Sequence, residues 1–128
     1  MQSLKNTDNG SVLLVEDHRE ASEAMELLLG VEGISTVTAE NGAEALTKIK
    51  TQGPVALVLL DLVMPVMNGW EFLRRKSADP SIAPIPVIVL TADPWAPQGV
   101  EKLKKPVNPE LLLKSVKRVI APETRSAD

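Results

Sequence analysis

Short apolar runs alternate with stretches of helical spacing along most of the chain. The most continuous run, at 55–60, is hydrophobic at every position, which is typical of a strand covered on both faces of a sheet. Similar runs predict strands at 12–15, 34–39, 86–90 and 100–105. The run at 34–39 contains Ser35, Thr36 and Thr38, which favours an edge position. The pattern therefore predicts five strands.

The intervening stretches place apolar residues on one face of a helix. They predict helices over 21–29, 42–50, 69–79 and 108–120. Gly30 or Gly33 is suited to end the first of these helices, and Asn68 or Gly69 to begin the third. Strands and helices therefore alternate, as they do in a parallel sheet with helices on both faces.

Right-handed crossovers and five strands predict a flavodoxin-like, doubly wound α/β fold with strand order 2-1-3-4-5. One domain is expected over 11–121, with flexible ends at 1–10 and 122–128. The segment 92–99, between the last two strands, contains two prolines and a glycine. Because proline breaks helices, we expect the fourth helix to be shortened or replaced by a loop there.

Composition narrows the class of protein further. The chain has 128 residues and a net charge of −3, with no basic excess for binding nucleic acid or an anionic membrane. It contains no cysteine, which excludes disulfides, thiolate metal sites and thiol nucleophiles. No signal peptide and no run long enough to span a membrane is visible. The sequence predicts a cytoplasmic protein.

Acidic residues follow two of the predicted central strands. Glu16 and Asp17 come directly after the first strand, and Asp61 comes directly after the third. In the predicted strand order these two ends lie at the switch point of the sheet, where α/β proteins usually place their chemistry. Three adjacent carboxylates repel one another unless a cation joins them, and oxygen ligands suit Mg²⁺. A magnesium site is therefore predicted at this edge.

The other two central strands end in a hydroxyl and an ammonium group. Thr91 follows the fourth strand and Lys105 the fifth. Opposite a metal-bound carboxylate, these groups suit a phosphoryl group, with Asp61 as its nucleophile. Lys104 is the alternative candidate for this ammonium group. Because side chains alternate along a strand, however, Lys104 points to the other face from Lys105.

Taken together, these motifs resemble the response-regulator receiver domain of two-component signalling. The resemblance rests on Glu16-Asp17, Asp61 with Met64-Pro65 and Asn68-Gly69, Thr91-Ala92, and Lys105-Pro106. It implies that Asp61 is the phosphoacceptor and that Lys105 contacts the phosphoryl oxygens, before a cis bond to Pro106. It also implies that Thr91 is the switch hydroxyl, and that Mg²⁺ is bound by Glu16, Asp17, Asp61 and the backbone carbonyl of Val63.

The resemblance implies a signalling switch and not an enzyme, since it would catalyse at most its own phosphorylation and dephosphorylation. A histidine kinase or histidine phosphotransfer protein would donate the phosphoryl group to Asp61 in a Mg²⁺-dependent reaction. No output segment follows Ile120, so we expect the signal to pass to a protein partner, or the chain to be part of a longer protein. The sequence identifies neither the kinase nor the partner.

Three features depart from the family pattern. Glu16 stands where aspartate is frequent, and Lys102 stands where an aromatic switch residue is expected, three positions before Lys105. The short segment 92–99 puts the usual dimer face in question, and its Trp95 is a candidate substitute for the aromatic residue. His18 is expected to be an exposed residue in the first helical turn.

Two alternative functions stay open at this point. The first is a degenerate receiver that acts only as an interaction module, which the departures favour and the intact acids, hydroxyl and lysine oppose. The second is a Mg²⁺-dependent aspartyl-phosphate phosphohydrolase. Such enzymes commonly place a second aspartate two residues after the nucleophile, and here Val63 occupies that position.

Overall fold

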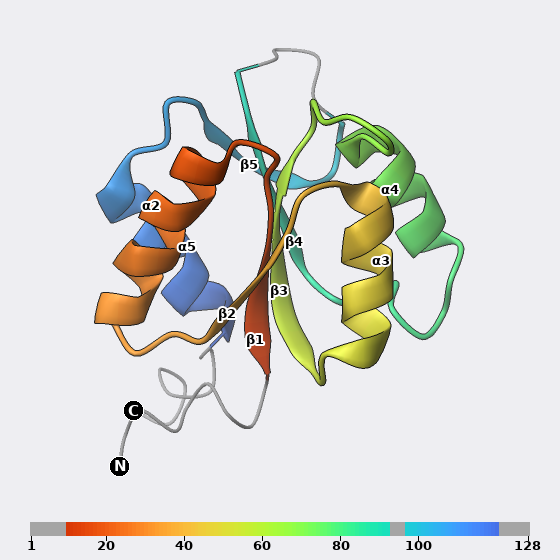
Figure 1. Cartoon of the computed structure of the whole chain (residues 1–128), viewed down its shortest axis with the longest axis horizontal. Helices are drawn as coiled ribbons and strands as arrows, with labels where there is room; N and C mark the ends of the chain where they lie inside the picture. Colours follow the sequence, from red (N-terminus) through yellow and green to blue (C-terminus); the bar gives the residue numbers. More distant parts are fainter. Residues whose placement is uncertain (1–9, 93–96, 121–128) are drawn as a thin grey trace.

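A computed structural model describes residues 10–92 and 97–120 and shows a parallel sheet between two layers of helices (Figure 1). Each predicted strand and helix is present, and each end lies within two residues of the predicted one. In chain order the elements are β1 (Ser11–Val15), α2 (Arg19–Val31), β2 (Thr36–Ala39), α3 (Gly42–Thr51), β3 (Val55–Asp61), α4 (Gly69–Ser77), β4 (Val87–Thr91), β5 (Glu101–Lys104) and α5 (Pro109–Ile120).

The strand order is β2-β1-β3-β4-β5, and every neighbouring pair is parallel. The prediction of a flavodoxin-like, doubly wound sheet is therefore confirmed. β2 and β5 are the two edges. Their positions agree with their sequences, since each contains fewer fully buried residues than β1, β3 or β4. The order reverses between β1 and β3, which places the switch point at the ends of these two strands.

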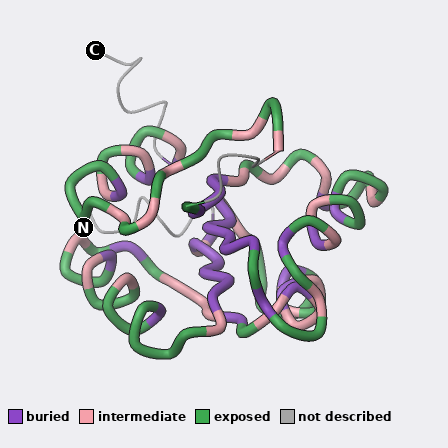
Figure 2. The backbone as a smooth tube through the Cα atoms, turned by 90° about the horizontal axis from the view of Figure 1, so that it is seen from above, coloured by how far each residue is buried: buried purple, intermediate pink, exposed green. Residues whose placement is uncertain are grey.

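Helices α2 and α5 cover one face of the sheet, and α3 and α4 cover the other (Figure 1). The central strands are buried along their length, as Figure 2 shows. Successive residues of a strand enter opposite cores: Val58 and Leu60 of β3 pack toward α3 and α4, and Leu57 and Leu59 toward α2 and α5. A strand apolar at every position is thus explained by two cores, one on each face.

An asparagine side chain caps the first turn of three helices, α3, α4 and α5, the last through Asn108, which accepts from the N–H of Leu111 at 3.0 Å. Asn41 precedes α3 and accepts a hydrogen bond from the backbone N–H of Glu44 at 2.9 Å. Asn68 precedes α4 and accepts one from the N–H of Glu71, also at 2.9 Å. These bonds satisfy N–H groups that the first helical turn leaves without a partner. The predicted start of a helix at Asn68 or Gly69 is confirmed.

The connection from β4 to β5 shows no helix at the described positions, Ala92 and 97–100. Over these positions it agrees with the predicted loss of the fourth helix, while 93–96, with Trp95, lie outside the described residues. The predicted flexible ends lie outside them too, except Gly10, which is buried and packs against Pro54. No helix in the described ranges is long and apolar enough to cross a membrane.

Candidate functional site

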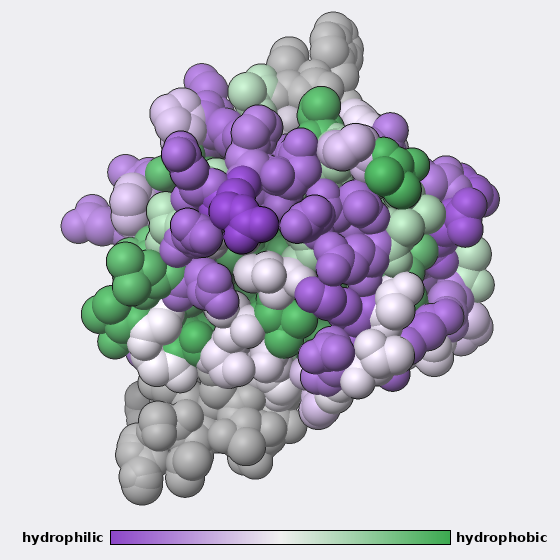
Figure 3. All heavy atoms as spheres, viewed as in Figure 1, coloured by the Kyte–Doolittle hydropathy of each residue, from purple (hydrophilic) through white to green (hydrophobic). Residues whose placement is uncertain are grey.

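Four strand ends bring polar side chains to one edge of the sheet. Glu16 directly follows β1, and Asp61 is the last residue of β3. Thr91 is the last residue of β4, and Lys105 directly follows β5. Because these four strands are consecutive neighbours, the four positions form a row along the edge. In Figure 3, hydrophilic side chains gather over the upper part of the molecule, where the strands end in this view.

Lys105 is the cation that joins two acids of this row. Its Nζ lies 3.1 Å from Asp61 Oδ1 and 3.4 Å from Glu16 Oε1. Glu16 and Asp61 are almost fully buried, with 3% and 5% of their surface exposed. Lys104, by contrast, is exposed and forms no ion pair with any described residue. The alternation expected from the sequence thus places Lys105, and not Lys104, in contact with Asp61.

The pKa of Asp61 is raised above its ordinary value. Burial is the main cause and the charge of Glu16 adds to it, while the hydrogen bond and charge of Lys105 act in the opposite direction without cancelling them. Burial lowers the pKa of Lys105, but the hydrogen bonds and charges of Asp61 and Glu16 outweigh burial and raise it. One lysine therefore does not compensate the crowded acids, and the site favours further positive charge.

The acids are arranged as a set of ligands for a cation. Ligand atoms of Glu16, Asp17, His18 and Asp61 all lie within 4.8 Å of one another. Asp17 Oδ1 is buried and accepts no hydrogen bond from the described residues. Burying a carboxylate oxygen without a donor is unfavourable, and a divalent cation would correct it. The residues therefore fit Mg²⁺, the ion expected from the sequence.

His18 is the residue whose place the sequence did not reveal. Its side chain is 77% exposed, as expected, but Nδ1 lies 3.2 Å from Glu16 Oε2 and 3.5 Å from Asp17 Oδ1. The backbone N–H of His18 also donates to Glu16 Oε2, at 3.2 Å. The signal available in the sequence was its position directly after the acidic pair.

The loop after β3 packs tightly beneath the site. The N–H of Gly69 donates to the carbonyl of Leu62 at 2.9 Å, and a Cβ on Gly69 would lie 2.6 Å from the carbonyl oxygen of Asp61. Only glycine allows this close approach of α4 to the end of β3. Met64 is buried in the core, and the N–H of Val63 lies 3.4 Å from Asp61 Oδ1. The role of the Val63 carbonyl as a metal ligand stays a prediction.

Thr91 lies at the end of β4 with 8% of its surface exposed. Its carbonyl accepts a hydrogen bond from the N–H of Lys105 at 3.1 Å, which ties the end of β4 to the residue that carries the ammonium group. The peptide bond between Lys105 and Pro106 is cis, as the resemblance implied.

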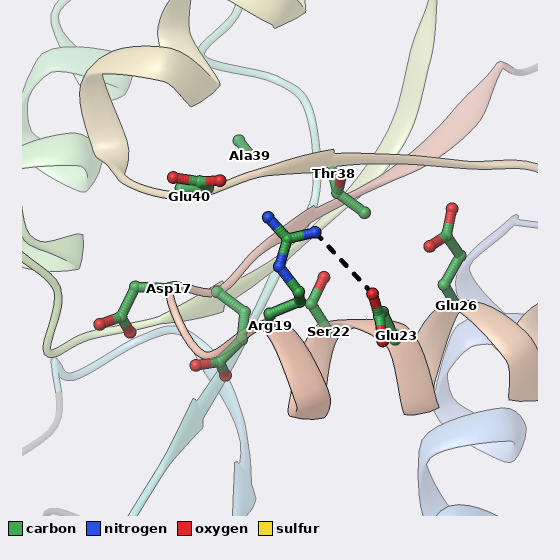
Figure 4. Close-up of a pocket in the computed structure, with 9 residues that line it drawn as sticks. Asp17, Arg19, Ser22, Glu23, Glu26, Thr38, Ala39 and Glu40 are labelled. Carbon is green, nitrogen blue, oxygen red and sulfur yellow. Dashed lines mark ion pairs between the residues drawn. The ribbon is translucent and has the colours of Figure 1, made fainter.

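A pocket of 330 Å³ lies beside the acids, between α2 and β2 (Figure 4). Glu16 and Asp17 contribute to its lining, but Asp61 does not. Arg19 lies across the pocket, with its Nη1 3.9 Å from Glu23 Oε2, and the carboxylate of Asp17 points away from it in Figure 4. Arg19 therefore pairs with Glu23 and not with Asp17, and Asp61 is not among the residues that line the pocket.

The sheet order defines a flavodoxin-like α/β domain, and its carboxylate–lysine cluster lies at the switch point of the sheet. A family model described as the response regulator receiver domain matches residues 12–117, and the chain belongs to this family. Receiver domains are phosphorylation-dependent switches of two-component signalling and generally not enzymes. Mg²⁺ and phosphoaspartate are features of the family, whose members interact with histidine kinases or phosphotransfer proteins and with downstream partners.

Curated relatives include Protein PilH of Pseudomonas aeruginosa, 32% identical over 86% of this chain and 97% of that protein. The transcriptional regulatory protein CpxR homolog of Haemophilus influenzae is 37% identical over 85% of this chain. The match spans only 49% of that relative, so this chain corresponds to about half of it.

Solved structures show the same fold. A putative response regulator from Chloroflexus aurantiacus has a TM-score of 0.79 and 28% identity, covering 87% of this chain and 97% of that one. The chemotaxis protein CheY4 of Vibrio cholerae has a TM-score of 0.76 and 31% identity, covering 85% and 97%.

Proposed function

We propose that this receiver domain is a phosphorylation switch in which Asp61 accepts a phosphoryl group from the phosphohistidine of a kinase or phosphotransfer protein. The observation that carries the proposal is the contact of 3.1 Å between Lys105 Nζ and the buried carboxylate of Asp61. This carboxylate lies among acids whose charge exceeds that of the lysine. A tetrahedral phosphoryl group on Asp61 would meet the ammonium group without further rearrangement of β5.

In this reaction an oxygen of Asp61 attacks phosphorus. The new O–P bond forms as the P–N bond to the donor imidazole breaks, and the imidazole leaves with that electron pair. Lys105 stabilises the charge on the phosphoryl oxygens, and the hydroxyl of Thr91 donates a hydrogen bond to one of them. Glu16, Asp17, Asp61 and the Val63 carbonyl would hold Mg²⁺, which supplies positive charge at the transferred group.

Phosphorylation would then change the surface around the strand ends, and a protein partner would bind the changed surface. The β4–β5 edge is suited to such a change, because every residue of β5 is at least partly exposed. We propose that this switch comprises residues 11–121. A cytoplasmic location is a prediction from the sequence that accords with a histidine kinase as donor.

The test is intact-mass spectrometry of the protein after incubation with Mg²⁺ and acetyl phosphate, a small phosphodonor. We expect an adduct of one phosphoryl group on the wild type and none on Asp61→Asn, which keeps the shape of the side chain and removes its nucleophilic oxygen. Omitting Mg²⁺ should suppress the adduct on the wild type, because the charge of the acids then opposes the incoming anion.

Other results would support the two alternatives. Fast release of inorganic phosphate without an adduct, lost in Asp61→Asn, would indicate a phosphohydrolase. No adduct and no phosphate release from a folded protein would indicate a degenerate receiver that acts only by binding. Either result would contradict the proposed switch.

A further inference from the structure

His18 occupies the N-cap position of α2 but does not cap the helix. N-cap side chains usually accept a hydrogen bond from an N–H of the first turn, which is why serine, threonine, aspartate and asparagine are preferred there. His18 makes no such bond. Its ring is turned instead toward the carboxylates of Glu16 and Asp17. The position of the ring is therefore explained by the acids and not by the helix.

The distances around His18 are those of neighbouring ligands on one metal ion. Octahedral bonds of about 2.1 Å place adjacent ligand atoms about 3 Å apart and opposite ones about 4.2 Å apart. His18 Nδ1 lies 3.2 Å from Glu16 Oε2 and 3.5 Å from Asp17 Oδ1, and the whole set, with Asp61, lies within 4.8 Å. The span of 4.8 Å is slightly wider than the octahedral one, so a small shift of the side chains would let the imidazole and the acids reach one ion together.

Glu16 and Asp17 differ in whether their carboxylate oxygens have partners. Glu16 already has both oxygens in contact, Oε1 with Lys105 and Oε2 with the N–H of His18. Asp17 Oδ1 has no hydrogen bond from the described part of the chain, although it is buried, and His18 Nδ1 is 3.5 Å away. An unsatisfied buried oxygen and a ring nitrogen thus face the same small space. A cation between them would satisfy Asp17 Oδ1 and would replace the 3.2 Å contact that His18 Nδ1 makes with Glu16 Oε2.

We propose that Nδ1 of His18 is a direct ligand of the bound divalent cation, together with Asp17 and Asp61. This inference rests on the proposed function in one respect, that the acids bind a divalent cation at all. A site made only of oxygen atoms suits Mg²⁺, whereas an imidazole ligand favours first-row transition ions in the order Mn²⁺, Co²⁺, Ni²⁺. His18 therefore shifts the selectivity of this receiver toward transition ions.

The direct test is pulsed electron paramagnetic resonance of the untagged protein loaded with Mn²⁺ alone. Electron spin echo envelope modulation detects nitrogen bound to Mn²⁺. Because the chain contains a single histidine, a bound imidazole nitrogen can come only from His18. We expect ¹⁴N modulation in the wild type, its replacement by a ¹⁵N pattern after labelling with ¹⁵N-histidine, and its loss in His18→Ser.

Serine is the replacement of choice because it is a preferred N-cap residue. His18→Ser should therefore fold with an intact start of α2, which circular dichroism and thermal unfolding verify. Calorimetric titration then compares two ions on both proteins. We expect the dissociation constant for Ni²⁺ to rise on the order of 10-fold in His18→Ser, and that for Mg²⁺ to change by less than about 3-fold.

The outcomes separate this inference from the proposed function. Mn²⁺ binding without nitrogen modulation, or an equal loss of affinity for Ni²⁺ and Mg²⁺, would overturn the role of His18 and leave the acidic metal site in place. Failure of the folded wild type to bind either ion would overturn both. Nitrogen modulation that disappears in His18→Ser supports the inference, whether or not Asp61 is phosphorylated.

Discussion

Two carboxylates only ten positions apart, Asp61 and Glu71, have opposite electrostatic environments. Asp61 is buried beside Glu16, and its pKa is raised by burial and by that neighbouring charge. Glu71 lies on α4 and accepts hydrogen bonds from Arg74 and Arg75, which lower its pKa to about 2. The helix acid is fully compensated by its own neighbours. The acid at the strand end is not, and it is the one suited to receive a cation and react.

Gly69 connects the helix α4, which carries Glu71, with the end of β3, which carries Asp61. It is the first residue of α4, and its missing side chain lets the helix contact the carbonyl of Asp61. Asn68 caps the same turn by accepting from the N–H of Glu71. The helix that carries the compensated acid therefore also fixes the backbone of the uncompensated one.

The largest effect is expected on the phosphorylation of Asp61, from removing the ammonium group of Lys105, which lies 3.1 Å from its carboxylate. Lys105→Gln should lower the initial rate of adduct formation with acetyl phosphate on the order of 100-fold, because a pre-organised charge next to the phosphoryl oxygens is lost. The matched control is Lys104→Gln, which changes an exposed neighbour and should stay within about 2-fold of the wild type. Equal rates in the two variants would show that Lys105 does not act on the phosphoryl group.

A smaller effect, on the free energy of unfolding, is expected from disturbing the contact between α4 and the end of β3. Gly69→Ala would bring a Cβ to 2.6 Å from the carbonyl oxygen of Asp61 and 2.8 Å from Leu62 Cα, so the backbone must move. We expect a loss of about 1–3 kcal/mol in the free energy of unfolding in urea. Gly30→Ala, in the last turn of α2 with no atom within 4 Å of the new Cβ, should instead cause no loss and a gain of at most about 1 kcal/mol. Similar changes in the free energy of unfolding for the two variants would contradict the close approach of Gly69 to the carbonyl of Asp61.

The uncompensated charge of Asp61 should appear in the pH dependence of stability. An acid whose pKa is raised in the folded state is penalised once it ionises. The penalty is absent below the ordinary pKa of 3.8 and grows as the pH rises from there through the folded pKa. In chelator, Asp61→Asn should therefore have a higher Tm than the wild type at pH 7, and this gain should vanish at pH 3. A lower Tm at pH 7 would show that Lys105 overcompensates the acid.

Removing the charge of Glu71 should change the stability in the opposite direction to removing that of Asp61, and by the smallest amount. The lowered pKa of Glu71 means that its contribution to stability is present above the ordinary value of 4.5 and is lost as the pH falls through about 2. Glu71→Gln should slightly lower the Tm at pH 7, less so in high salt, because exposed ion pairs are screened. The carboxyl carbon of Glu71 should titrate by NMR with a midpoint of about 2. A midpoint near 4.5 would remove the contrast with Asp61.

The fold followed from the sequence because its strongest signals are local and periodic. A strand apolar at every position, such as 55–60, must be covered on both faces, which allows few arrangements of five parallel strands. The meeting of Glu16, Asp61 and Lys105 followed in turn, since the carboxyl ends of parallel strands share one edge. Topology alone was enough to bring these residues together.

Features that depend on side-chain direction could not be predicted in this way. The sequence placed His18 in an exposed first turn but held no information on the rotamer that turns Nδ1 toward Glu16. The raised pKa of Asp61 depends on the balance between burial and Lys105, which only distances settle. The pocket beside Asp17 depends on the packing of α2 against β2, elements whose contact the sequence does not specify.

In the proposed switch Asp61, and no other acid of the site, receives the phosphoryl group. The most direct test of this proposal is chemical trapping: the phosphorylated protein is reduced with borohydride, which converts an aspartyl phosphate to homoserine, and then digested and sequenced by mass spectrometry. We expect homoserine at position 61 only, formed when both Mg²⁺ and phosphodonor are present. Homoserine at position 17, or none at all in a protein that carries the phosphoryl mass, would contradict the proposal.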